Sequence, residues 1–137
     1  MIDESRVLRK LQVITDSLSK LEELACMDRD SFLSDFRSID SAKYSLQISI
    51  EAMIDICNHI ISRKRFRAPA TNAESFEIVS EAGLLPADAL PVYRSMARFR
   101  NRIVHIYDEV DDSQVYEILQ ARLGDIRDFV RSIVSIC

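Results

Sequence analysis

Hydrophobic residues recur at alternating steps of four and three along most of this chain. The clearest run is Val7, Leu11, Ile14, Leu18, Leu21 and Ala25, and no glycine or proline interrupts it. This spacing puts the whole run on one face of a helix, where it can pack along a neighbouring helix. The chain holds only two glycines and three prolines, too few for the turns of a many-stranded sheet. The sequence therefore predicts an all-α fold.

Four long helices account for most of the apolar pattern. They are expected at about residues 3–25, 38–64, 86–106 and 112–137. With one or two short helices they form an antiparallel bundle in a single domain, residues 1–137. The apolar seams are longer than one small bundle needs, so we expect a homodimer with twofold symmetry to bury the remainder.

Short helices and caps fill the connections. One short helix is expected at residues 31–36, with Asp30 as its N-cap, and would pack onto the bundle through Phe32, Leu33 and Phe36. Another would begin after Thr71 or Asn72 and end at Gly83, where the backbone turns left-handed.

The last helix is expected to run unbroken to the C-terminus. Asp111 would be its N-cap, and Gln114 would complete a capping box. Gly124 lies inside this helix, where it either allows a close approach of two helices or has no role.

Charge and cysteine content exclude several classes of protein. The net charge of −4 argues against a general nucleic-acid binder, yet eight of the eighteen Lys and Arg residues lie in the acid-free stretches 63–67 and 94–102. The three cysteines are widely spaced and form no CxxC, so neither a disulfide framework nor a zinc site is expected. No apolar run approaches the ~18 residues of a membrane span, and no leader is recognisable, so we expect a cytoplasmic protein.

One charged residue interrupts an apolar stripe of the third long helix. The stripe consists of Tyr93, Ala97, Arg100, Val104 and Tyr107. A buried guanidinium is costly unless it is paired. Glu51 or Asp55 could supply the partner, since both lie on a polar row with Asn58 and Ser62. Alternatively, this row is simply a solvated helix face.

The end of the same helix carries groups suited to phosphate chemistry. Asn101 and His105 are four residues apart and share a face, and Arg100 is offset from them. Histidine moves protons near neutral pH, and arginine stabilises charge on phosphate oxygens. RNA cleavage by its own 2′-hydroxyl needs these two parts without a metal, although one histidine cannot be both acid and base. A dimer would supply two, whereas a structural role for His105 would need neither.

The string Arg-Asn-x-x-x-His-x-Tyr, at residues 100–107, resembles the R-x4-H-x-Y motif of HepT-like toxins in the HEPN superfamily. The segments Ile50–Ile61 and Met96–Phe99 resemble the corresponding helices, and the resemblance spans the whole chain. It implies a metal-independent endoribonuclease without cofactor, active as a homodimer. By motif position Arg100 and His105 would be catalytic.

The resemblance also implies a partner and further site residues. By motif position Asn101 would shape the site, and Glu51 or Asp55 would shape it as the partner of Arg100. A minimal nucleotidyltransferase antitoxin would transfer AMP from ATP to Tyr107, and the added negative charge would repel RNA.

The basic stretches predict where RNA would bind. The RNA substrate, tRNA or mRNA, would be guided by Arg63, Lys64, Arg65, Arg67, Arg98 and Arg102.

Several alternatives remain open on the sequence alone. The domain could be a non-catalytic module that docks a nucleotidyltransferase, or a dimerisation domain in which Arg100 is only part of an ion pair. Tyr107 could be a core residue of its stripe, and Phe66 could stack on an RNA base or pack in the core.

Overall fold

The computed structural model describes residues 3–137 and confirms the all-α prediction, with no strand in this range. Met1 and Ile2 lie outside the described part. The helices are α1 (Glu4–Ala25), α2 (Arg29–Leu33), α3 (Phe36–Lys64), α4 (Asn72–Glu81), α5 (Leu90–His105), α6 (Asp112–Ala121) and α7 (Leu123–Val134), with 3-10 turns η1 (Ala87–Ala89) and η2 (Tyr107–Glu109). Within residues 3–137, no helix has the length and apolar character that crossing a membrane would require.

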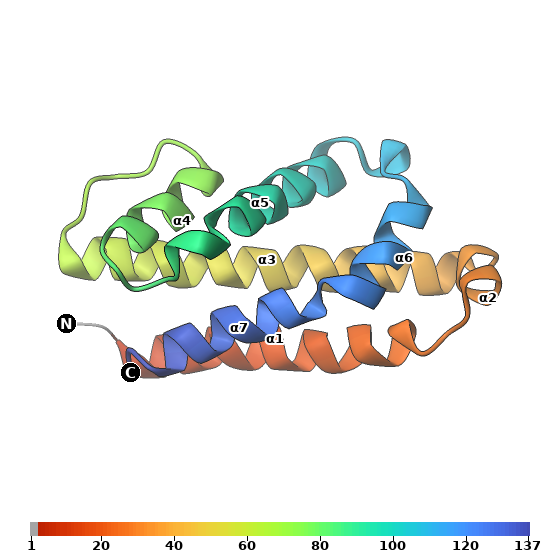
Figure 1. Cartoon of the computed structure of the whole chain (residues 1–137), viewed down its shortest axis with the longest axis horizontal. Coiled ribbons are helices and arrows are strands. Elements are labelled where there is room, and N and C mark those ends of the chain that lie inside the picture. The colour runs from red at the N-terminus through yellow and green to blue at the C-terminus, as the bar shows by residue number, and fades with distance from the viewer. Residues whose placement is uncertain (1–2) are drawn as a thin grey trace.

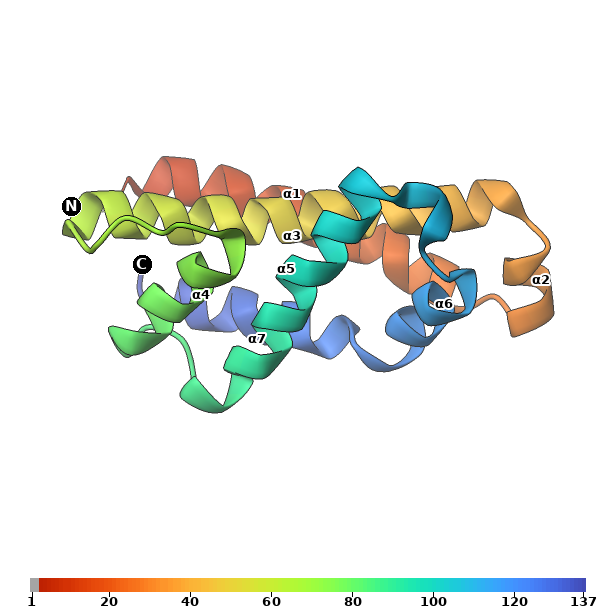
Figure 2. The ribbon, with the colours of Figure 1, turned by 90° about the horizontal axis from the view of Figure 1, so that it is seen from above.

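The long helix α3 is the axis of the bundle. It extends along the whole molecule, with α1 antiparallel beside it (Figure 1). The helix α5 crosses α3 obliquely near its middle, and α4 packs against both (Figure 2). The chain then returns through α6 and α7, which pack against α1. This arrangement puts the C-terminal end of α5 over the first half of α3.

The predicted α1 seam forms one side of the core. Val7, Leu11, Ile14, Leu18 and Leu21 are all buried, as the spacing predicts. Short helix α4 also begins and ends as predicted, since the Thr71 side chain accepts the Glu74 N–H and Gly83 has φ +78°.

The prediction for the first short helix is wrong in its register. The N-cap is Asp28, not Asp30, and its carboxylate accepts both the N–H and the hydroxyl of Ser31. Asp35 then caps α3 in extended conformation, so the short helix has to end before it. Phe36 consequently belongs to α3 and is 67% exposed rather than packed onto the bundle.

The predicted unbroken last helix is also wrong, because it divides at Arg122 into α6 and α7. Asp111 is the N-cap as predicted, but Gln114 completes no capping box within the described residues and lines a pocket instead. A Cβ added at Gly124 would meet nothing within 4 Å, so this glycine permits no close helix approach.

Candidate functional site

The motif lies where α5 ends and the chain turns into η2. Pro91 occupies the first turn of α5, where its missing N–H costs nothing, and Tyr93 and Ala97 bury the start of the stripe. The stripe then leaves the core, and Val104 is 40% exposed, which contradicts its predicted packing. The helix ends at His105 because Ile106 leaves helical geometry, at φ −137° and ψ 47°.

Arg100 is half-buried and held by Glu51. Its Nε and Nη2 donate to Glu51 Oε2 at 3.0 and 2.8 Å, and Nη1 donates to the Asn101 side-chain oxygen at 3.2 Å. Gln47 donates to the same carboxylate oxygen at 3.2 Å. Three hydrogen bonds leave two of the five guanidinium N–H groups for a ligand. The cation is therefore fixed in place but not saturated.

The positions of Glu51 and Asp55 around α3 determine which of the two carboxylates pairs with Arg100. Glu51 faces α5, whereas Asp55 faces α1 and pairs with Lys10 at 2.9 Å. The rest of the polar row, Asn58 and Ser62, is exposed, so the alternative of a solvated face holds for part of the row. Asp55 does not contact Arg100, and the site-shaping role predicted for it has no support in this geometry.

His105 is the histidine that solvent reaches. Within the described residues it makes no hydrogen bond, and it is exposed. The other histidine, His59, is buried, and its Nε2 accepts the backbone N–H of Asp3 at 3.0 Å. Burial lowers the pKa of His59, so it stays neutral. His105 is five positions after Arg100, which places the two about 140° apart around the helix. A single protomer does not bring the two together.

Tyr107 is neither a core residue nor free at the surface. It is 36% exposed, and its hydroxyl donates to the Asp40 carboxylate. The Lys43 ammonium lies 4.4 Å from the centre of its ring. Burial and the hydrogen bond to Asp40 raise the pKa of Tyr107 above its ordinary value. The alternative of a core aromatic is therefore excluded, and the side chain is exposed but held by Asp40 and Lys43.

Comparison with known proteins assigns the fold and motif to a family. The model of the family described as "Ribonuclease HepT-like" matches residues 14–133. The chain belongs to this HepT-like family. A curated tRNA nuclease HepT of Aphanizomenon flos-aquae is 29% identical over 126 residues, covering 92% of this chain and 86% of the relative. A curated mRNA nuclease HepT of Shewanella oneidensis is 27% identical over 124 residues, covering 90% and 92%.

Solved structures of HepT-like relatives agree with this fold along the whole chain. A tri-AMPylated Shewanella oneidensis HEPN toxin in complex with MNT antitoxin has a TM-score of 0.88 and 27% identity, covering 98% of this chain and 99% of that one. A toxin–antitoxin structure with AMP-PNP has a TM-score of 0.89 and 26% identity, covering 96% and 98%.

Sequence reasoning missed the two residues that contact Tyr107, Asp40 and Lys43. Lys43 Nζ bonds the Tyr107 carbonyl at 3.4 Å and pairs with Asp112 at 3.0 Å, and its side chain is only 5% exposed. The signal was present, because extending the α3 seam backwards from Leu46 by three and four residues gives Lys43 and Ile39. A lysine at a core position is costly unless its ammonium group pairs with a specific partner. Asp40 carries no such signal.

The basic stretches divide into engaged and available side chains. Arg67 is paired with Glu74 and Glu81 at 3.3 and 3.1 Å, and Arg94 with Glu77 at 2.8 Å. Within residues 3–137, no ion pair forms at the remaining predicted RNA-binding residues, which are Arg63, Lys64, Arg65, Arg98 and Arg102. Phe66 is partly buried against the core, in agreement with its structural alternative.

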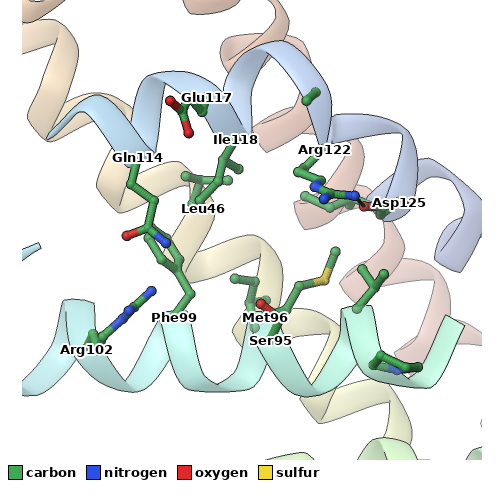
Figure 3. Close-up of a pocket in the computed structure, with 15 residues that line it drawn as sticks. Leu46, Ser95, Met96, Phe99, Arg102, Gln114, Glu117, Ile118, Arg122 and Asp125 are labelled. Carbon is green, nitrogen blue, oxygen red and sulfur yellow. Dashed lines mark ion pairs between the residues drawn. The ribbon is translucent and has the colours of Figure 1, made fainter. Parts of the chain in front are cut away.

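A pocket of about 500 Å³ opens between α5 and the helices α6 and α7 (Figure 3). Leu46 and Ile50 of α3 also line it, and Arg102 and Gln114 lie at one end. Arg100 and His105 are not among its lining residues. Arg100 and His105 therefore lie outside this pocket. Elsewhere in residues 3–137, no three His, Cys, Asp or Glu side chains are grouped closely enough to hold a metal ion.

Proposed function

We propose that this chain is an endoribonuclease toxin that cleaves RNA at the cleft of a homodimer. Arg100 and His105 are its catalytic residues, and Asn101 and Glu51 hold Arg100 in place. The observation that carries the proposal is the state of Arg100, which is fixed by Glu51 and keeps N–H groups for a phosphate. Membership of the HepT-like family and relatives named tRNA and mRNA nucleases support the same conclusion.

The reaction needs a base, an acid and a phosphate-binding cation, but no metal ion. The base takes the proton of the RNA 2′-hydroxyl, and that oxygen attacks the adjacent phosphorus. The bond from phosphorus to the 5′-oxygen breaks, and the acid gives that oxygen a proton. The products are a 2′,3′-cyclic phosphate and a 5′-hydroxyl. Arg100 stabilises the negative charge that develops on the phosphate.

Twofold symmetry supplies what one protomer lacks. Arg100 and His105 diverge around α5, and each protomer has a single exposed histidine. Two exposed apolar side chains suit an interface between copies of the chain. Tyr44 lies on α3, and Val104 lies on α5, the helix that carries Arg100. In the dimer one imidazole is the base and the other, protonated, is the acid.

The proposal includes a partner and a means of silencing. Relatives of known structure are complexes of a toxin with an MNT antitoxin, and one toxin is tri-AMPylated. We propose that a minimal nucleotidyltransferase transfers AMP to Tyr107, two residues from His105. The added phosphate brings negative charge beside the site, and the nucleotide occupies the cleft.

The first test is RNA cleavage by the purified protein in EDTA. We expect Arg100→Ala and His105→Ala to abolish cleavage and the wild type to yield cyclic-phosphate ends. Arg94→Ala is a matched control, since Arg94 is on the same helix and also paired with a glutamate. If both motif variants cleave like the wild type, this site is not the catalytic one. Binding of the nucleotidyltransferase without any cleavage would instead favour the non-catalytic docking module.

A mixing experiment tests the composite cleft. With equal amounts of wild-type and His105→Ala subunits, random exchange leaves both histidines in about a quarter of the dimers. If cleavage needs the histidines of both protomers, we expect the rate to fall to about a quarter of that of the same amount of wild type. A fall to only about a half after verified exchange would restrict each site to one protomer.

A further inference from the structure

The Tyr107 hydroxyl has a built-in hydrogen-bond acceptor. Asp40, on the first turns of α3, is exposed and accepts this hydroxyl's proton in a hydrogen bond across 67 residues of sequence. This contact has no evident structural necessity, because a tyrosine at the surface can be solvated by water. A role for Asp40 in modification depends on the proposed transfer of AMP to Tyr107.

We propose that Asp40 is the proton acceptor for nucleotidyl transfer to Tyr107. The phenolic oxygen forms a bond to the α-phosphorus of a nucleoside triphosphate, and the bond to the pyrophosphate leaving group breaks. The phenolic proton passes to the Asp40 carboxylate and then to water. The toxin thus supplies the base for its own modification, and the partner enzyme supplies the nucleotide.

The environment of Tyr107 makes a base necessary. Burial and the contact with Asp40 raise the pKa of this phenol, so it is fully protonated at neutral pH. A protonated phenol is a weak nucleophile, and a carboxylate already within hydrogen-bond distance can remove the proton as the bond to phosphorus forms. Base and nucleophile therefore have the required geometry before any partner binds.

Lys43 is a positioning residue for the same step. Its buried ammonium lies against the Tyr107 ring, and it is held there by Asp112 and by the Tyr107 carbonyl. A ring fixed at its face and at its backbone can direct the hydroxyl only toward a narrow range of partners. These contacts keep the phenol hydroxyl hydrogen-bonded to Asp40, while part of the Tyr107 side chain stays exposed to the nucleotide.

The decisive variant is Asp40→Asn, because asparagine keeps an oxygen that accepts the hydrogen bond but cannot take up the proton. The rate of mass gain with ATP, Mg²⁺ and the nucleotidyltransferase proposed as the partner would be followed by intact mass spectrometry under single-turnover conditions. We expect the maximal rate to fall about 100-fold, the usual share of a general base, with unchanged half-saturation by the partner enzyme. Asp40→Glu should restore part of the rate.

The pH profile separates a base from a structural contact. The groups that face Tyr107 are Asp40 and Lys43 on α3, Asp108 on η2 and Asp112 on α6. Between about pH 6 and pH 9 a carboxylate stays ionised, so it can act throughout, whereas Asp40→Asn must rely on hydroxide. The ratio of wild-type to variant rate should therefore fall as pH rises. A purely structural role predicts a constant ratio.

Controls distinguish this inference from the proposed function. Tyr107→Phe should gain no mass, whereas Asp128→Asn, which changes a carboxylate of α7 that pairs with Arg131, should gain it at the wild-type rate. Unmodified Asp40→Asn should cleave RNA like the wild type. If Asp40→Asn is modified as fast as the wild type, the base belongs to the nucleotidyltransferase and this inference alone is wrong. If the wild type gains no mass, the proposed silencing is wrong as well.

Discussion

At the scale of single residues, Arg100 shows how a cation is tolerated at the edge of an apolar stripe. The side chains of Arg100 and Glu51 are 23% and 31% exposed, so water still screens the pair. Its contribution to stability is therefore small, below about 1 kcal/mol. The carboxylate matters more for orientation, because two guanidinium nitrogens converge on one of its oxygens.

Replacing Glu51 by glutamine tests that orientation. The amide keeps the shape but loses the charge that holds Arg100, so we expect RNA cleavage to fall about tenfold, because small displacements of a catalytic group are costly. The free energy of unfolding in urea should change by less than about 1 kcal/mol. The matched control is Glu77→Gln, which weakens the comparable pair with Arg94. Equal cleavage by the two variants would leave Glu51 with a structural role only.

At the scale of elements, Lys43 joins three segments that are far apart in sequence. It lies on α3, bonds the carbonyl of Tyr107 in η2 and pairs with Asp112 at the first residue of α6. The chain between α5 and α6 is thereby tied to α3, and the end of the motif helix is held with it.

Lys43→Met removes this tie and keeps the apolar length of the side chain. We expect the free energy of unfolding to fall by about 2 kcal/mol, since charged hydrogen bonds from a buried group are lost. Lys10→Met, which breaks a more exposed pair with Asp55, should cost less than about 1 kcal/mol. Urea unfolding of both proteins measures the difference. Equal losses would show that burial gives Lys43 no special weight.

The C-terminus of α3 carries local strain. Arg65 caps it with φ 57° and ψ 38°, a left-handed conformation that favours glycine. We expect Arg65→Gly to raise the free energy of unfolding by up to about 1 kcal/mol, and Arg65→Lys to leave it nearly unchanged. Thermal unfolding of the three proteins would check this. A loss of stability in Arg65→Gly would show that the Arg65 side chain contributes more than its backbone strain costs.

At the scale of the whole molecule, a net charge of −4 coexists with four arginines and no acidic residue in the stretch 94–102. Arg98, Arg102 and His105 are exposed and lie within about 60° of one another on one flank of α5, and neither arginine is in an ion pair within the described residues. An RNA phosphate that approached this flank would meet uncompensated positive charge. Binding should therefore depend steeply on salt.

Arg98→Ala combined with Arg102→Ala tests this surface in an inactive His105→Ala background. Each lost phosphate contact lowers the slope of log affinity against log salt by about 0.7 for single-stranded RNA, so the double change should lower it by about 1.4. Fluorescence anisotropy at several salt concentrations gives the slope. Arg131→Ala, on α7 and paired with Asp128, is the control and should not alter it. An unchanged slope in the double variant would exclude this flank from RNA binding.

Most of the fold could be predicted from local information. The seam of α1 fixes a buried face because its period is that of a helix, and the caps Thr71 and Asp111 act on N–H groups only a few residues away. Two helix boundaries were predicted wrongly, the start of α2 at Asp28 and the break between α6 and α7 at Arg122. At each of them a short segment could belong to either of two adjacent helices. Local propensity does not determine which helix includes it, because the boundary depends on how both helices pack.

The order of the residues was thus enough to specify the helices, the family motif and the presence of a cation in need of a partner. It took the packed helices to establish that this partner is Glu51 rather than Asp55, and that Asp40 and Lys43 hold Tyr107. The reason is physical. Residues one turn apart on α3 face different neighbours, and which neighbour they meet depends on how α5 and α1 pack across it.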